Sequence, residues 1–412
     1  MTHRRLSTAL TCLLFLNLAV ADDWPQFRGS DQSGRSQETG LLSQWPATGP
    51  TQLWKVNNLG SGYSTPSISQ GKIYVTGYVD DKEVLTALDE STHSVVWTSK
   101  IADAERDVGY GHGPRSTPTV DGTLIFTLGA GGHLSCVKAS NGSLLWQTNL
   151  KTKLDGKMMS GWGFSESVLV DGNTVIATPG GRDGTVAAFN KFNGELIWRT
   201  KELKDRAAYA SVVKTTIHGT QQYVTLTGDH VAGINPDTGK LYWKAARQGR
   251  TAVIPTPIIY QDHVYVTSGY NVGCNLFRIS KDSNRFTAEE VYANKDLKNH
   301  HGGAIRVGEY IYASSGPVIV CMNMMSGEVA WEERSVGKGA LVFADGKLIL
   351  RSEKGPVALI EANPKEFREI SRFDQPERSD KNAWPHPVVA NGKLYLRDQG
   401  SLFCYDLSPS AI

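Results

Sequence analysis

The chain has 412 residues, with 43 lysines and arginines against 41 acidic residues and a net charge of +2. This balance gives no argument for binding to nucleic acid or to an anionic membrane surface, both of which favour a strongly basic protein. The length alone would allow more than one domain. Glycine is plentiful, at 42 residues, which suits a chain with many tight turns. No long helical periodicity follows residue 21, so we expect short strands.

Residues 1–21 have the pattern of an export signal. A basic start at residues 3–5 precedes an apolar run over residues 10–20, and the final Ala-Val-Ala fits the small-x-small pattern of a cleavage site. The apolar run is short for a bilayer span, and a retained anchor is the alternative. We therefore expect an exported protein of the periplasm or cell envelope, with no transmembrane segment after cleavage.

The next segment, residues 22–50, is rich in glycine, serine and glutamine and has few strand signals. We expect an irregular arm that lies on the rest of the molecule. Residues 51–56 then look like the last strand of a repeat whose earlier strands are missing. The C-terminus holds the complement, with strands expected at residues 393–397 and 401–406 and no closing tryptophan. We therefore expect one domain, residues 51–408, in which the two ends meet and leave no open sheet edge.

A ten-residue pattern recurs between these ends. It reads INPDTGKLYW at residues 234–243, and it has counterparts at residues 88–97, 137–146, 189–198 and 322–331. Trp97, Trp146, Trp198 and Trp243 stand 49, 52 and 45 residues apart, and Trp331 follows after 88, or two steps of 44. Each copy predicts a strand, a tight turn with glycine at φ > 0, and a second strand. A period of 40–50 residues built of short strands indicates a radial or stacked array.

The number of repeats predicts the architecture. Seven units begin near Tyr63, Arg115, Trp162, Tyr209, Ile254, His300 and Lys338, and a composite unit begins near Trp384. We predict an all-β, eight-bladed β-propeller of four-stranded antiparallel blades, with the last blade closed by the N-terminal strand. A seven-bladed ring with one degenerate repeat is the alternative. Units five and seven lack the closing tryptophan, and we expect residues 285–292 and 367–373 to supply their outer strands.

Four cysteines follow the expected leader: Cys136, Cys274, Cys321 and Cys404. They fall in different repeats, so we expect them to be too far apart for disulfides. Three of them occupy the position held by Ala87 in its own repeat, a site for a small inward side chain. Buried free thiols are therefore expected.

The repeated Ala-x-Asp-x-x-Thr-Gly-x-x-x-Trp pattern resembles the PQQ-type (quinoprotein) propeller repeat, in which the tryptophan docks between neighbouring blades. The resemblance covers essentially the whole chain after the leader. Such repeats build both quinoprotein dehydrogenases and the non-catalytic outer-membrane assembly factor BamB. The segments WPQFRG, GPRSTP, WGFSES and WPHP, starting at residues 24, 113, 162 and 384, resemble those of exported PQQ-like propellers of planctomycete-type bacteria. For most of that group no activity is implied.

The innermost strand of each blade lines the channel of a propeller, and Ser-Thr-Pro-like triplets such as residues 64–66 and 116–118 align these strands. The residue before each triplet and the residue two positions later then share one face. With neighbouring Trp162, this alignment predicts a ligand-binding channel mouth of aromatic and cationic groups with Glu166 as its acid: Tyr63, Arg115, Trp162, Glu166, Tyr209, His301, Lys338, Trp384 and His386. The alternative is that these are ordinary half-exposed strand ends. Adjacent His300 and His301 point to opposite faces of a strand, so we expect no shared metal.

Three functions fit these features. The first is a monomeric, non-enzymatic scaffold for an envelope protein partner, as BamB-like proteins are, including a role in outer-membrane protein assembly; this function needs no cofactor. The second is a quinoprotein oxidoreductase of alcohols or sugars. The resemblance implies PQQ with calcium held by Glu, Asn and Asp groups, an aspartate base and often adjacent cysteines. In this sequence we expect Glu166 to correspond to one calcium ligand, and Trp162 or Trp384 to the aromatic ring on which PQQ stacks. The other groups have no counterpart. The third is binding of a carbohydrate or small anion without turnover.

Overall fold

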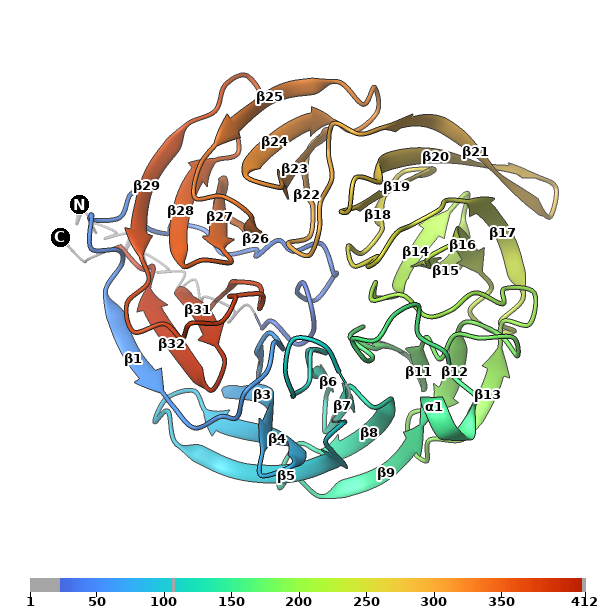
Figure 1. Cartoon of the computed structure of the whole chain (residues 1–412), viewed down its shortest axis with the longest axis horizontal. Coiled ribbons are helices and arrows are strands. Elements are labelled where there is room, and N and C mark those ends of the chain that lie inside the picture. Colours follow the sequence, from blue (N-terminus) through green and yellow to red (C-terminus); the bar gives the residue numbers. More distant parts are fainter. Residues whose placement is uncertain (1–22, 106–107, 410–412) are drawn as a thin grey trace, which may run out of the picture.

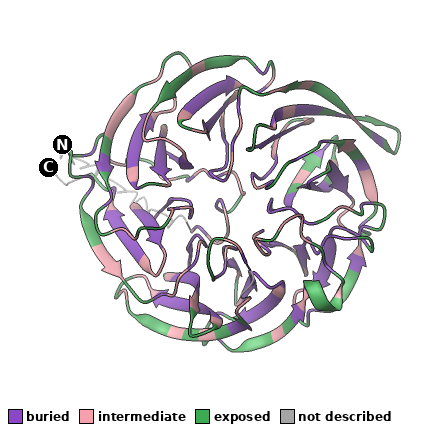
Figure 2. Ribbon diagram, in the orientation of Figure 1, coloured by how far each residue is buried: buried purple, intermediate pink, exposed green. Residues whose placement is uncertain are grey.

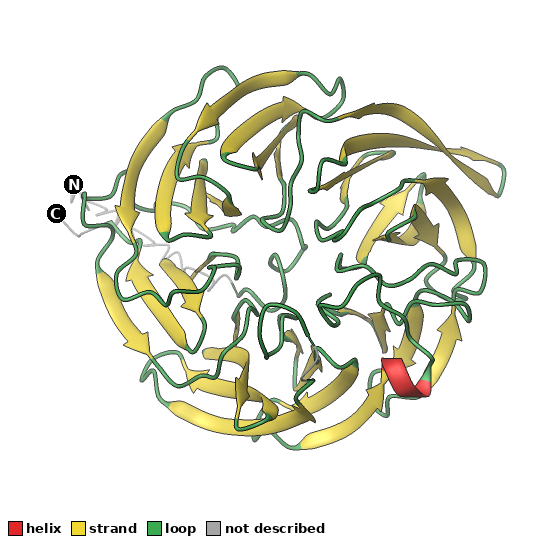
Figure 3. Cartoon of the chain, in the orientation of Figure 1, coloured by secondary structure: helices red, strands yellow, loops and turns green. Residues whose placement is uncertain are grey.

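The structure is a computed structural model that describes residues 23–105 and 108–409. The expected export signal at residues 1–21 lies outside the described residues. Within the described part of the chain, no helix is long and apolar enough to cross a membrane. Strands dominate this part, and the short helix α1 (Leu150–Lys153) is an insertion at the edge of one sheet (Figure 3).

The strands form eight four-stranded antiparallel sheets arranged around a central axis (Figure 1). Blade one contains β2 (Ser67–Ser69), β3 (Lys72–Val79), β4 (Lys82–Asp89) and β5 (Val95–Asp103). Blade two contains β6 (Thr119–Asp121), β7 (Leu124–Leu128), β8 (His133–Lys138) and β9 (Leu144–Asn149). Blade three contains β10 (Leu169–Asp171), β11 (Thr174–Ala177), β12 (Ala187–Asn190) and β13 (Leu196–Arg199). Blade four contains β14 (Val213–Ile217), β15 (Thr220–Leu226), β16 (His230–Ile234) and β17 (Leu241–Ala246).

The second half of the ring repeats this order. Blade five contains β18 (Ile258–Tyr260), β19 (His263–Ser268), β20 (Gly273–Asp282) and β21 (Arg285–Asn294). Blade six contains β22 (Ile305–Val307), β23 (Tyr310–Ser315), β24 (Val318–Asn323) and β25 (Val329–Arg334). Blade seven contains β26 (Gly339–Ala344), β27 (Lys347–Ser352), β28 (Pro356–Glu361) and β29 (Glu369–Asp374). Blade eight contains β30 (Val388–Ala390), β31 (Lys393–Asp398), β32 (Ser401–Asp406) and β1 (Gln52–Val56).

The ring closes in blade eight by pairing the two ends of the chain. β1 runs antiparallel to β32, with Trp54 opposite Cys404 and Val56 opposite Leu402. The eight-bladed prediction with an N-terminal closing strand is therefore confirmed, and the seven-bladed alternative is wrong. The outer strands predicted for blades five and seven are also present, as β21 and β29.

Four of the repeated tryptophans join their blade to the next by a hydrogen bond. Trp97 donates its indole N–H to the carbonyl of Ala139 in the following blade at 3.1 Å. Gly142, in the same turn, has a φ of +76°, and a Cβ there would lie 2.6 Å from the Trp97 ring. Only glycine therefore satisfies both the turn and the ring beneath it. The same indole-to-carbonyl bond recurs between later blades: Trp146 to Lys191, Trp198 to Pro236, and Trp331 to Asn363.

Four junctions depart from this pattern. In blade four, Trp243 donates its indole N–H to the side-chain oxygen of Gln222 in the same blade at 2.7 Å. Blade seven has no tryptophan on its outer strand β29. In blade five, which lacks the tryptophan, Tyr292 takes its place and donates its hydroxyl hydrogen to the carbonyl of Met324 at 2.7 Å. At the closing junction His93 stands where the other turns have glycine, at a φ of +59°. Its ring stacks on Trp54 at 4.6 Å, so the imidazole supplies the contact that the glycine edge supplies elsewhere.

The small residues expected to face inward lie opposite the tryptophans. Ala87 pairs with Trp97, and Cys136, Cys321 and Cys404 hold the corresponding position in their own blades. A larger side chain there would displace the indole, which explains why alanine and cysteine alternate. All four cysteines of the described residues are buried and free, as predicted.

Burial follows the radial order of the strands. The inner three strands of each blade are mostly buried between neighbouring blades, and the outer strands face solvent (Figure 2). On the outer strands of blades one to three, aliphatic side chains remain between 45 and 55 % exposed. We call this set the apolar rim: Val95, Val96, Leu144, Leu145, Leu196 and Ile197.

The N-terminal arm, residues 23–50, crosses the channel and closes one of its ends (the blue thread in Figure 1). Trp24 bridges to Ile68 of blade one. Arg28 donates to the carbonyl of Ala304 in blade six at 2.7 Å, and Gln32 donates to that of Val212 in blade four at 3.2 Å. The arm thus ties opposite sides of the ring together and gives the channel a floor.

Candidate functional site

The channel opens on the side away from the arm into a cavity of about 310 Å³. Its wall is built from the segments that lead into the first strand of every blade. Each blade contributes one of these residues: Tyr63, Arg115, Trp162, Tyr209, Ile254, His301, Lys338 and Trp384. Phe27 of the arm, whose ring meets His386 edge-on at 5.0 Å, lies at the bottom. Because the same point of the repeat is used eight times, the ring architecture itself gathers these side chains.

Eight of the nine residues proposed from the sequence line this cavity, and Glu166 does not. Its carboxylate is buried and accepts hydrogen bonds from the backbone N–H and, at 2.7 Å, the hydroxyl of Thr178. The cavity is instead lined here by Ser165 and Ser167. Our alignment treated residues 165–167 as strand, but β10 begins only at Leu169, so strand alternation does not apply.

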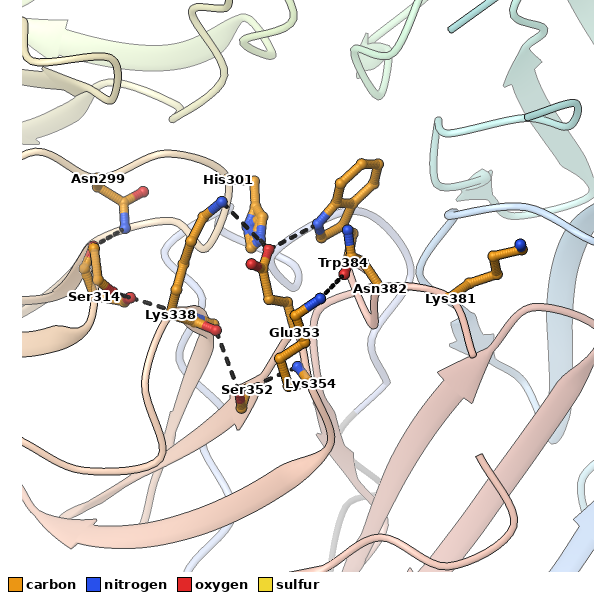
Figure 4. A network of polar contacts seen from close by, with 12 residues as sticks. Asn299, His301, Ser314, Lys338, Ser352, Glu353, Lys354, Lys381, Asn382 and Trp384 are labelled. Carbon is orange, nitrogen blue, oxygen red and sulfur yellow. Dashed lines mark hydrogen bonds and ion pairs between the residues drawn. The ribbon is translucent and has the colours of Figure 1, made fainter. Parts of the chain in front are cut away.

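The acid of the cavity is Glu353, which the sequence analysis missed. It follows β27, in the connection to β28. One carboxylate oxygen, Oε2, lies 3.3 Å from the ammonium of Lys338. The same atom accepts the indole N–H of Trp384 at 3.1 Å and the imidazole Nε2–H of His301 at 3.4 Å. Figure 4 shows these three side chains converging on Glu353 from blades six, seven and eight.

Five aromatic rings form a continuous surface around the mouth. Trp384 contacts Tyr63 at 4.7 Å and Tyr110 at 5.2 Å between ring centroids. Tyr110 reaches Trp162 at 5.8 Å, and Trp162 reaches Tyr209 at 6.0 Å. Tyr110 was not predicted, since it lies on the connection between blades one and two rather than in a repeat. The rings of Tyr63, Trp162 and Trp384 are only half-buried, so parts of their surfaces remain open to a ligand.

Arg115 holds the connection that carries Tyr110. Its guanidinium donates to the carbonyls of Gly109 and Gly113 at 2.7 Å and of Gly111 at 3.1 Å. Burial lowers the pKa of Arg115, although the tyrosines beside it act in the opposite direction. The side chain is therefore a cation whose donors serve mainly to shape the mouth.

Three histidines beside the cavity are held neutral. Burial, together with the nearby Lys338, lowers the pKa of His300 to about 4, and burial and His300 lower the pKa of His301 well below its usual value. The pKa of His386 falls to about 4 because the side chain is buried close to Arg28. His386 donates its Nε2–H to the carbonyl of His301 at 2.9 Å. Among the residues that the structure describes, the charged groups that line the cavity are therefore Arg115, Lys338 and Glu353.

The sequence of this chain matches one known protein family. A family model described as "Outer membrane protein assembly factor BamB" matches residues 80–333, more than half of the chain. The chain belongs to this family. The resemblance to PQQ-like propeller repeats is thereby confirmed. None of the curated proteins compared with the chain matches it in sequence.

Solved structures share the fold at low sequence identity. BamB from Moraxella catarrhalis aligns with a TM-score of 0.61 at 15% identity, over 88% of this chain and 99% of that one. The quinohemoprotein alcohol dehydrogenase from Comamonas testosteroni gives 0.66 at 11%, over 95% and 81%. A europium-containing methanol dehydrogenase gives 0.65 at 11%, over 92% and 90%. Identities this low establish the propeller alone, because scaffolds and enzymes are built on it alike.

The residues of the cavity do not fit a calcium-held quinone. Across residues 23–105 and 108–409, no three histidine, cysteine, aspartate or glutamate side chains converge as metal ligands. Glu353 is paired with Lys338, and the amide oxygen of Asn382 accepts from the ammonium of Lys354 at 3.0 Å (Figure 4). A calcium ion would have to compete with a lysine at Glu353 Oε2 and at the amide oxygen of Asn382, and oxygen ligands already committed to cations bind calcium poorly.

Proposed function

We propose that this protein is an exported, non-enzymatic scaffold of the cell envelope that acts as a monomeric ring and binds a protein partner. The observation that carries the proposal is the state of Glu353. Among the described residues, the one carboxylate that lines the cavity is engaged by Lys338, His301 and Trp384, so it is not poised as a free aspartate- or glutamate-type base. Membership of the BamB family supports the same conclusion, and it suggests outer-membrane protein assembly as the setting.

The apolar rim is the surface we propose for the partner. Solvent-exposed aliphatic side chains on three consecutive outer strands are unusual for a protein that meets only water. They lie on the circumference, away from the cavity, so docking there leaves the channel mouth open. The apolar run at residues 10–20 supports export and hence a partner in the envelope.

The proposal is tested by cross-linking in an envelope fraction. Tagged protein is compared with Leu145→Asp on the rim and with Val329→Asp, a matched outer-strand residue on blade six that lies outside the rim. We expect a reproducible cross-linked partner with wild type and with Val329→Asp, and its loss with Leu145→Asp. Absence of any reproducible partner, or equal recovery with both variants, would contradict a scaffold that acts through this rim.

A further inference from the structure

A second, more polar groove of about 650 Å³ lies beside the channel cavity. The groove runs over blade six and is lined by the β19–β20 connection, the β23–β24 turn and the end of β25. Tyr270, His300 and Lys338 line both spaces, so the two lie side by side. Both volumes lie in the range of about 300–1,000 Å³ that is usual for ligand sites. A ligand seated in the cavity therefore has a way out for a chain attached to it.

The two spaces differ in chemistry. The cavity presents the aromatic surfaces of Tyr63, Trp162 and Trp384, which pack well against a flat apolar ring face. The groove presents acidic, basic and amide side chains: Asp296 and Glu332, Lys298 and Arg334, and Asn271. The ligand that matches has a ring with one apolar face at its end, followed by units rich in hydroxyl groups.

The charge at the junction selects an anion. Lys338 stands between the cavity and the groove and is 30% exposed. Its partner Glu353 also accepts from His301 and Trp384, so three donors offset the negative charge of this carboxylate. With Arg115, which leads into blade two, the described residues that line the cavity carry a net positive charge. A carboxylate on the terminal ring would gain a charge-assisted hydrogen bond from Lys338.

We propose that the channel mouth binds the end of an acidic oligosaccharide. A terminal uronate ring packs against Trp384 and Tyr63 with its carboxylate towards Lys338, and the following sugars leave along the groove over blade six. A peptide is the weaker match, because the groove is walled by turns and side chains rather than by a long free strand edge that could pair with a peptide backbone. Glycan binding at the mouth and partner docking at the rim use different residues, so each can fail alone.

Calorimetric titration of the full protein with defined galacturonate oligomers of one to six units tests this proposal. We expect affinity to rise with length as the groove fills, and neutral cello-oligomers and acidic peptides of equal length to bind at least about tenfold more weakly. Trp384→Ala and Lys338→Met should each weaken binding by about tenfold or more. The exposed residues Phe192 and Lys240 supply matched controls, and their replacement by alanine should leave the affinity unchanged.

Glu353→Gln gives the sharpest readout. The amide can still accept a hydrogen bond from Trp384, but it no longer pairs with Lys338 and no longer repels a carboxylate on the ligand. The affinity for the galacturonates should therefore rise by about threefold or more, and the affinity for the neutral oligomers should stay unchanged. Circular dichroism confirms that each variant is folded. The proposal is overturned if no galacturonate binds, if binding is indifferent to both Lys338→Met and Glu353→Gln, if a single unit binds as tightly as a hexamer, or if peptides bind better.

Discussion

The contact between a turn glycine and the tryptophan of the preceding blade should be a main source of stability in this ring. At Gly194 the φ is +72°, and a Cβ would lie 2.5 Å from the ring of Trp146. Gly194→Ala therefore forces an alanine into the left-handed conformation, which costs about 1–2 kcal/mol. It also displaces the packed indole of Trp146, which costs about 1–3 kcal/mol. Weakening the 2.9 Å bond from Trp146 to the Lys191 carbonyl adds about 1 kcal/mol. We expect a total loss of about 3–6 kcal/mol.

Gly172→Ala is the matched control. This glycine lies in the same blade with a φ of +57°, but no atom lies within 4 Å of its Cβ position. Its replacement should cost only the conformational part, about 1–2 kcal/mol. Urea unfolding, followed by tryptophan fluorescence, measures both variants alone and in a Trp146→Ala background. The reasoning is refuted if the two glycine variants are equally destabilised, or if Gly194→Ala costs as much without Trp146 as with it.

Two further outcomes follow from buried charges. Burial raises the pKa of Glu166 from 4.5 to about 7, so between these pH values the folded state binds a proton more tightly than the unfolded state does. As pH rises from below 4.5 to above 7, this group should therefore lower the free energy of unfolding by up to about 3 kcal/mol. Glu166→Gln should remove that loss, and parallel urea midpoints for the two proteins at pH 5 and pH 8 would contradict the assignment. Arg28→Met leaves buried backbone carbonyls unpaired and should destabilise the protein by about 2–4 kcal/mol while exposing residues 29–50 to limited proteolysis. An arm that is cleaved no faster than in wild type would show that this arginine does not hold it across the channel.

The architecture could be predicted because its signals are local and repeated. The tryptophan recurs in five copies of the pattern, and in four of them a turn glycine precedes it by four residues, so each copy marks a strand hairpin. Closure of the ring could also be predicted, because the single strand around Trp54 has no partners within its own segment. The departures could not: nothing in the local sequence says that Tyr292 replaces an indole, or that His93 takes a glycine conformation to stack on Trp54.

The site was predictable only where it uses the repeat. Residues such as Tyr63 and Trp384 stand directly before the first strands, at a position that the repeat itself aligns. Glu353, Tyr110 and Tyr270 come from connections whose lengths differ between blades, so no periodic signal marks them. The position of Glu166 was misjudged because an irregular segment does not alternate its side chains as a strand does.

The measurement that tests the central claim most directly is addition of PQQ and calcium to the purified protein, with equilibrium binding and dye-linked oxidation of alcohols and sugars followed together. A channel mouth whose carboxylate is held by Lys338 should give neither stoichiometric PQQ binding nor turnover. Stoichiometric binding with turnover that is lost in Trp384→Ala would contradict the account and make this propeller an oxidoreductase.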